Sequence, residues 1–163
     1  MNVAAEEPRL VDCDVVPPEA WRSMSGLDLM RALIAGKLPA PPIAGLVGFS
    51  LIEAGEGTAT FAGTPAFRHY NPAGSVHGGY AGLLLDSCMT CAVQTTLEAG
   101  WGCVTLEYKV SLVRPMTKDT GPVRAEGKVI YAGKRTGSAE GRIIDAQGRV
   151  LAHGTTTVLV FQV

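Results

Sequence analysis

The chain has 163 residues, 47% of them hydrophobic and only 18% charged, and its formal net charge at pH 7 is −1. This length suits one domain with a sizeable core, and the low charge content suggests that another subunit covers some apolar surface. The balanced charge, without a Lys/Arg cluster, argues against nucleic acid as the main partner, and no apolar run approaches the roughly 18 residues of a membrane span.

The start of the chain, residues 1–14, is acidic and has no apolar segment of the kind found in signal peptides, so we expect a cytoplasmic protein. Disulfides are not expected there. Cys88 and Cys91 form a C-x-x-C pattern, but it falls inside a helical pattern and has no histidine at ligand spacing. We interpret these cysteines as small buried hydrophobes, with a redox or metal role as the alternative, and predict no metal site.

Residues 1–42 are predicted to form an N-terminal arm ahead of the main domain, residues 43–163. Residues 1–24 contain Pro8, Pro17 and Pro18 and are expected to be irregular. Ser25 is expected to cap a helix over residues 26–35, with Asp28 three residues on as in a capping box. The proline cluster at 39–42 should end this helix region.

The main domain is predicted to begin with a hairpin and a long helix. Residues 47–54 and 58–62 are typical of two short strands around the turn at 55–57. A polar loop, 63–75, leads to a helix from about Gly78 to about Leu97. Apolar residues lie nearly all round this helix, so we expect it to be buried.

Four further strands are predicted, at residues 103–113, 123–131, 136–145 and 150–161. In the first, apolar and polar residues alternate, which places on one face Val104, Leu106, Tyr108, Val110 and Leu112. Two strands, one helix and then only strands indicate an α+β fold. We therefore predict an antiparallel sheet of about five or six strands wrapped around one long central helix.

The segment from Asn71 to Asp86 carries the strongest chemical signal. His77 precedes Gly78-Gly79 at the predicted helix start, Asn71 lies six residues before His77, and Asp86 lies nine residues after it. An ionised aspartate on an apolar helix is costly unless it has a partner or a chemical role. The glycines leave backbone N–H groups open to an approaching anion. This combination predicts attack on a carbonyl group.

These residues, together with Gly74, Thr105, the strand end 112–115 and the segments 125–127 and 151–153, resemble the hotdog-fold acyl-CoA thioesterases. The resemblance covers roughly residues 43–161 and is close to the phenylacetate-degradation (PaaI-like) group. It implies hydrolysis of a CoA thioester to free acid and CoA, with no cofactor apart from the CoA of the substrate. It also implies a hotdog fold and a homodimer, often paired into a tetramer, with shared active sites. One chain would supply Asn71, His77 and Gly78, and the other would supply Asp86 and Thr90.

Two parts of this predicted site act on the carbonyl group. The backbone N–H of Gly78, together with that of Gly79, would stabilise the oxyanion. Asp86 would serve as general base for a water or as nucleophile, and both routes stay open. The alternative is a structural Asp86 paired with a cation or with backbone N–H groups.

The remaining site residues would orient water or the carbonyl group. Thr90, one turn beyond Asp86, would hold the water or bond back to the carbonyl of residue 86. Thr105 would serve the same water or be an ordinary strand residue. Asn71 would orient the water or form an Asx turn, and His77 would steady the loop or the carbonyl, or be structural.

Cations are required for the phosphates of CoA. Arg114, Lys134 and Arg135 are the candidates, and for the Lys134–Arg135 pair in the turn the alternative is that both charges are simply solvated.

Two other functions compete: a non-catalytic acyl-CoA-binding module, which has no need of Asp86, and a hotdog dehydratase or hydratase. The latter ranks last because such enzymes usually lack a His-Gly-Gly followed by an aspartate nine residues on.

Overall fold

The structure, a computed structural model, describes residues 9–163. Its helices are η1 (Leu10–Asp12), α1 (Pro18–Ser23), α2 (Gly26–Ile34), α3 (Pro42–Val47), η2 (Phe67–His69) and α4 (Gly78–Gln94). Its strands are β1 (Phe49–Gly55), β2 (Thr58–Gly63), β3 (Trp101–Leu112), β4 (Val123–Ala132), β5 (Thr136–Ile144) and β6 (Val150–Gln162).

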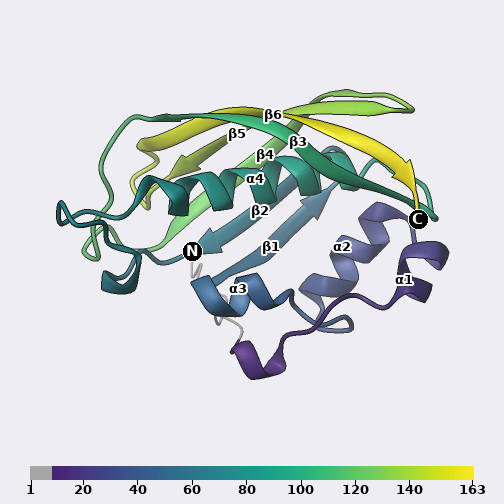
Figure 1. Cartoon of the computed structure of the whole chain (residues 1–163), viewed down its shortest axis with the longest axis horizontal. Helices are drawn as coiled ribbons and strands as arrows, with labels where there is room; N and C mark the ends of the chain where they lie inside the picture. The colour runs from purple at the N-terminus through teal and green to yellow at the C-terminus, as the bar shows by residue number, and fades with distance from the viewer. Residues whose placement is uncertain (1–8) are drawn as a thin grey trace.

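The six strands form one antiparallel sheet in the order β1-β2-β4-β5-β6-β3, which curls around α4 (Figure 1). This arrangement confirms the predicted α+β architecture and the hairpin of β1 and β2. Strands β1 and β3 are the two edges of the sheet.

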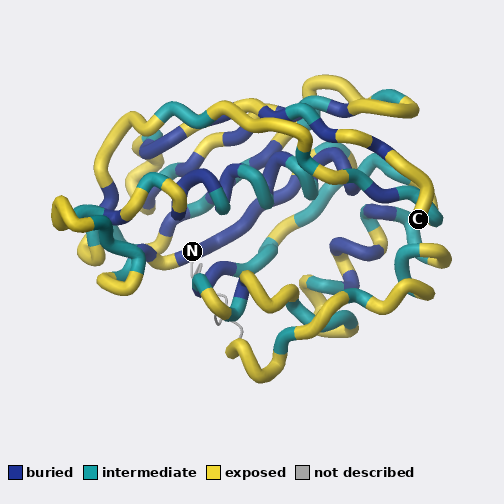
Figure 2. Tube along the Cα trace, in the orientation of Figure 1, coloured by how far each residue is buried: buried dark blue, intermediate teal, exposed yellow. Residues whose placement is uncertain are grey.

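The core lies between α4 and the inner face of the sheet. Leu84, Leu85, Met89 and Val93 of α4 are fully buried there (Figure 2). The helix approaches the sheet so closely that a Cβ on Gly127 of β4 would come within 2.1 Å of a helix carbonyl oxygen. Only glycine fits at such a contact, so this strand position fixes the height of α4 above the sheet.

One stripe of α4 departs from the expectation of a helix buried all round. Its members are only half-buried: Leu83, Asp86, Ser87, Thr90 and Cys91. The helix also ends at Gln94 rather than near Leu97, because Thr95 and Thr96 turn their hydroxyls back to helix carbonyls. Asp86 is therefore on the one side of α4 that the sheet leaves open.

The N-terminal arm is partly as predicted. The hydroxyl of Ser25 accepts a hydrogen bond from the Asp28 N–H and caps α2, which confirms this helix. The expectation that residues 1–24 are irregular is wrong for 18–23, where Pro18 at the first helical position suits α1; residues 1–8 lie outside the described part. The predicted strand start at Val47 is also wrong, since Pro42 opens α3 and Gly48 ends it at φ 82°.

Strand β3 does not keep its predicted alternation. A bulge in its pairing with β6, between Thr105 and Glu107, inserts Leu106 as an extra residue. Thr105 contacts α4 before the bulge, and Tyr108 contacts α4 after it. Val104 therefore lies on the opposite face from Tyr108, not on the same face as predicted.

Candidate active site

Asp86 lies at the centre of a small polar cluster on the open stripe of α4. The Thr105 hydroxyl of β3 donates a 2.7 Å hydrogen bond to the Asp86 carboxylate, and the Thr90 hydroxyl lies 2.7 Å from the Thr105 hydroxyl and 3.4 Å from the carboxylate. A carboxylate only accepts, so the chain of donors runs from Thr90 to Thr105 to Asp86. Thr90 does not bond back to its own helix.

The carboxylate has no cationic partner among residues 9–163, and it is half-buried rather than enclosed. The Thr105 hydroxyl, itself held by Thr90, fixes the orientation of the carboxylate. A half-open carboxylate with a fixed orientation can bind and deprotonate a water molecule or attack an electrophile.

Gln94, which was not predicted as a site residue from the sequence, aligns this cluster. Its buried side chain donates to the Trp101 carbonyl at 3.1 Å and accepts from the Cys103 N–H at 3.1 Å. These bonds tie the last turn of α4 to the start of β3, two residues before Thr105. The sequence spacing could have predicted this role, because Asp86, Thr90 and Gln94 lie at positions i, i+4 and i+8, on one face of a largely apolar helix.

The start of α4 holds the predicted oxyanion donors. His77 is the N-cap residue, and its Nδ1 accepts a 2.8 Å hydrogen bond from the Gly79 N–H, so that donor is occupied. The Gly78 N–H has no acceptor among the described residues. Gly78 also contacts Leu112 of β3, whose Cδ1 would lie 2.8 Å from an added Cβ.

The loop before α4 positions Asn71 as an Asx turn. Its side-chain oxygen accepts from the N–H groups of Ala73 at 2.9 Å and Ser75 at 3.3 Å, and its amide donates to the Ser75 hydroxyl at 3.1 Å. The side-chain amide of Asn71 therefore shapes the loop through these hydrogen bonds. Within one protomer, none of these hydrogen bonds connects Asn71 to Asp86.

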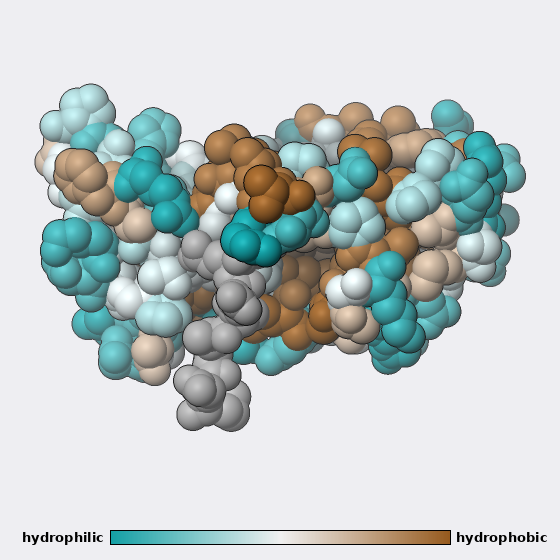
Figure 3. All heavy atoms as spheres, turned by 90° about the horizontal axis from the view of Figure 1, so that it is seen from below, coloured by the Kyte–Doolittle hydropathy of each residue, from teal (hydrophilic) through white to brown (hydrophobic). Residues whose placement is uncertain are grey.

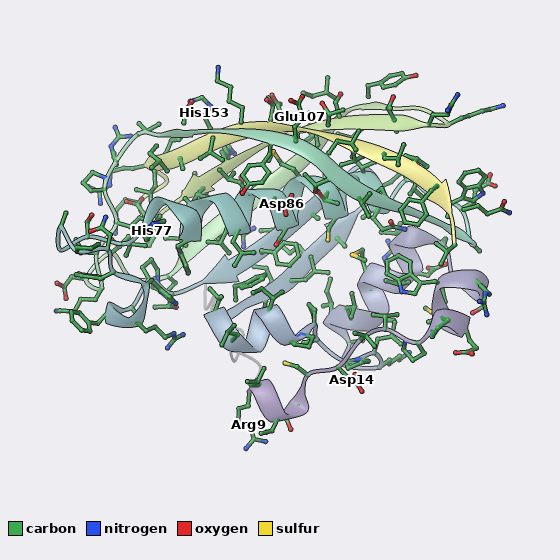
Figure 4. All side chains as sticks on the ribbon, viewed as in Figure 1. Arg9, Asp14, His77, Asp86, Glu107 and His153 are labelled. Atoms are coloured by element: carbon green, nitrogen blue, oxygen red, sulfur yellow. The ribbon has the colours of Figure 1, made fainter. Side chains whose placement is uncertain are left out.

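The two halves of the predicted site are separated along α4. Gly78 and Asp86 are eight residues apart, which at 1.5 Å per residue is about 12 Å. Figure 4 shows His77 at one end of the helix and Asp86 near its middle. One carbonyl group therefore cannot contact both the Gly78 N–H and the Asp86 carboxylate of the same chain.

Comparison with known proteins identifies the fold and shows a similarity to one enzyme family. A model of the Thioesterase superfamily matches residues 73–152, which span the start of α4, Asp86 and Thr105. A phenylacetic acid degradation-related protein from Ralstonia eutropha has 26% sequence identity and a TM-score of 0.72, over 80% of this chain and 98% of its own. Over residues 73–152 the chain is similar to the thioesterase superfamily. No curated protein sequence matches it.

Two more distant structures share the fold. The Escherichia coli PaaI protein from the phenylacetic acid degradation operon has 23% identity and a TM-score of 0.72, over 85% of this chain and 96% of its own. The smu.793 protein of Streptococcus mutans, solved bound to acetyl CoA, has 20% identity and a TM-score of 0.64, over 71% and 90%. The sheet around α4 is thus the hotdog fold, as the sequence predicted.

The cations predicted for CoA lie at opposite ends of the sheet. Arg114 donates to the carbonyl of Val150, at the start of β6, whereas the carbonyl of Arg135 accepts from the N–H of Val160 near its end. Ten strand residues separate these points, or about 33 Å. Arg114 and the Lys134–Arg135 turn do not form one anion site within a protomer.

Cys88 and Cys91 fit the interpretation as small hydrophobes. Burial raises the pKa of the Cys91 thiol to about 12, with the charges of Cys103 and Asp86 adding to this effect. Burial likewise raises the pKa of Cys103 to about 12 and that of Cys88 further. Thiols with such pKa values stay protonated and do not act as nucleophiles at neutral pH.

Proposed function

We propose that the chain is an acyl-CoA thioesterase whose active site is shared by two protomers. One protomer supplies the Asp86 carboxylate with its threonines, and the second supplies the Gly78 N–H. The separation of about 12 Å between these groups within one chain carries the proposal, because a site built from one chain alone would lack either its base or its oxyanion donor.

The exposed edge strand β3 supports such a dimer. Its apolar side chains Val104, Leu106 and Leu112 are 46%, 58% and 61% exposed, and a long unpaired edge of this kind invites pairing with another strand. In an antiparallel pair of β3 strands, a two-fold axis that sets Leu112 beside the partner's Thr105 also sets Thr105 beside the partner's Leu112. Because Leu112 contacts Gly78 and Thr105 contacts Asp86, this register creates two complete sites.

The chemistry then follows from the donors and acceptors. As general base, Asp86 takes a proton from water while the water oxygen attacks the thioester carbon. The carbonyl oxygen becomes an oxyanion that accepts from the partner's Gly78 N–H, and the C–S bond breaks as the proton passes to the CoA sulfur. As nucleophile, Asp86 forms an anhydride and expels CoA, and water then hydrolyses the anhydride.

The same dimer gives the CoA phosphates a cationic site. Under the two-fold axis, Arg114 lies at the same end of the joined sheet as the partner's Lys134–Arg135 turn. The acetyl CoA bound by the Streptococcus mutans protein, which has this fold, supports a CoA thioester as the substrate. The predicted cytoplasmic location is part of this proposal. None of the helices over residues 9–163 is long and apolar enough to cross a membrane.

Thiol release from short, long and aryl acyl-CoA esters tests this proposal, with Asp86→Asn as the diagnostic variant. The substitution keeps shape but removes basicity and nucleophilicity, so kcat should fall by roughly 10²–10⁴-fold with the folded structure retained. Asp119→Asn, in an exposed loop, is the matched control and should keep wild-type activity. Wild-type kcat in Asp86→Asn would show that Asp86 is structural and the mechanism wrong.

A further inference from the structure

An apolar cavity of about 380 Å³ lies between the N-terminal arm and the hotdog domain. The arm lines one side, and the hairpin and α4 line the other. Its residues are Met30, Leu33, Ile34, Ala40, Pro41, Ala44, Phe49, Ser50, Leu51, Phe61 and Cys91. Brown, apolar atoms gather in the middle of the face seen from below, where the arm lies, with hydrophilic atoms at both ends (Figure 3). The size and lining are those of a small-molecule site.

The cavity and the candidate active site lie against neighbouring parts of α4. Cys91, which lines the cavity, directly follows Thr90 of the polar cluster. Asp86 and Cys91 are five residues apart on the helix, or about 7.5 Å along its axis. Both belong to the half-buried stripe of α4. Asp86 does not line the cavity and lies about 140° from Cys91 around α4, so an acyl chain with its carbonyl carbon at Asp86 would cross the half-buried stripe and pass Cys91 to enter the cavity.

A second hollow, on the outer face of the sheet, has different chemistry. It measures about 750 Å³ and is lined by charged residues that pair with each other, including Arg124 with Glu53 at 2.8 Å and Arg142 with Glu126 at 2.9 Å. His153 and Glu107 lie on this side of the sheet, away from Asp86 (Figure 4). A hydrocarbon chain here would lie against these charged side chains, whereas the lining of the cavity beside the arm has no charged residue.

We infer that the cavity between the arm and the hotdog domain binds the acyl tail of the substrate, and that the arm thereby makes the enzyme selective for extended hydrophobic acyl groups. The inference rests on the proposed function. The arm contributes Met30, Leu33 and Ile34 from α2, and α2 is fixed to the fold by a 2.9 Å hydrogen bond from the Gly26 N–H to the carbonyl of Leu97. An acetyl group ends before Cys91, whereas a longer chain passes it and buries its methylenes.

The wild-type enzyme provides the first test. Saturated acyl-CoA esters of increasing length are compared by kcat/KM. Each methylene buried in the cavity should raise kcat/KM about fourfold until the cavity is full. A kcat/KM that does not change with chain length would overturn the inference without any variant.

Filling the cavity provides the second test. Leu33→Trp should lower kcat/KM for dodecanoyl-CoA by about 10-fold or more and leave acetyl-CoA hydrolysis unchanged. Leu27→Trp is the matched control, since Leu27 lies on the same helix and is also half-buried but does not line the cavity. It should keep the wild-type length profile. An unchanged profile in Leu33→Trp, or the same shift in both variants, would refute the assignment.

A binding measurement separates this inference from the proposed function. Calorimetric titration of Asp86→Asn with acetyl-CoA and dodecanoyl-CoA reports affinity without hydrolysis. Tighter binding of dodecanoyl-CoA that Leu33→Trp abolishes supports the cavity, even if no acyl-CoA is hydrolysed and the proposed function fails. Hydrolysis that depends on Asp86, with equal affinity for both esters, would keep the proposed function and overturn the cavity assignment.

Discussion

The hydroxyl of Thr105 is expected to determine how well Asp86 works. In Thr105→Val the side chain keeps its shape, but the 2.7 Å hydrogen bond to the carboxylate is lost, and the remaining donor, Thr90, lies 3.4 Å away. A hydrogen bond to a charged group contributes about 1.5–3 kcal/mol. If it holds Asp86 in the reactive orientation, kcat should fall roughly 10- to 100-fold with little change in KM.

Thiol release from the best acyl-CoA, followed with a chromogenic disulfide, measures this loss. Thr105→Ser restores the hydroxyl and should recover most of the activity. Thr155→Val, the same substitution at an exposed position of β6, should leave kcat unchanged. A wild-type kcat in Thr105→Val would refute the reasoning that the threonine orients the carboxylate, and equal losses in the Val and Ser variants would show that packing alone is at stake.

Two further predictions concern stability. Gln94→Leu removes the hydrogen bonds to the part-buried Trp101 carbonyl and Cys103 N–H, and urea unfolding should show a loss of about 1 kcal/mol for each bond. An unchanged midpoint would mean that the stability of the fold does not depend on these bonds. Burial alone would raise the pKa of Asp145, but hydrogen bonds from the Arg149 N–H and guanidinium and the Gln147 N–H lower it overall. This stabilisation is present above the ordinary aspartate pKa of about 3.9 and is lost as the pH falls through the lower folded value. Asp145→Asn should therefore lower the unfolding midpoint at pH 7 but progressively less below about pH 4; an equal loss at pH 3 would contradict this.

The sequence predicted the sheet and the central helix because their patterns are strong. A helix that is apolar over most of its surface must be largely enclosed, and consecutive strands around it leave an antiparallel sheet as its main cover. The bulge at Leu106 was not predictable, because alternation in β3 continues through it in the sequence and the extra residue shows only in the pairing with β6. The arm was misjudged because prolines that signal irregular chain also open α1 and α3.

The candidate site was predicted as a set of residues but not as a geometry. The spacing of Asp86 and Thr90 follows from helix periodicity, so their contact was foreseeable. The contact with Thr105 depends on how β3 crosses α4, which Gln94 sets through long-range bonds. The split between Gly78 and Asp86 was implied only by the family resemblance; the helix geometry now supplies its physical reason.

Two inactive variants mixed in one assembly test the shared site most directly. Gly78→Pro removes the N–H at the first position of α4, where proline is tolerated and where His77, at ψ 135°, already has the backbone conformation that precedes proline. Loss of this donor should cost roughly 10²–10³-fold in kcat. Gly78→Ala adds a Cβ but keeps the N–H, and it should retain far more activity.

Gly78→Pro and Asp86→Asn chains are then co-expressed in equal amounts. In a mixed dimer one site combines the intact Asp86 of one chain with the intact Gly78 of the other, and the second site carries both defects. Random pairing makes half of the dimers mixed, so the assembly should recover about a quarter of the wild-type activity. Activity no higher than the average of the two separate variants would contradict the shared site.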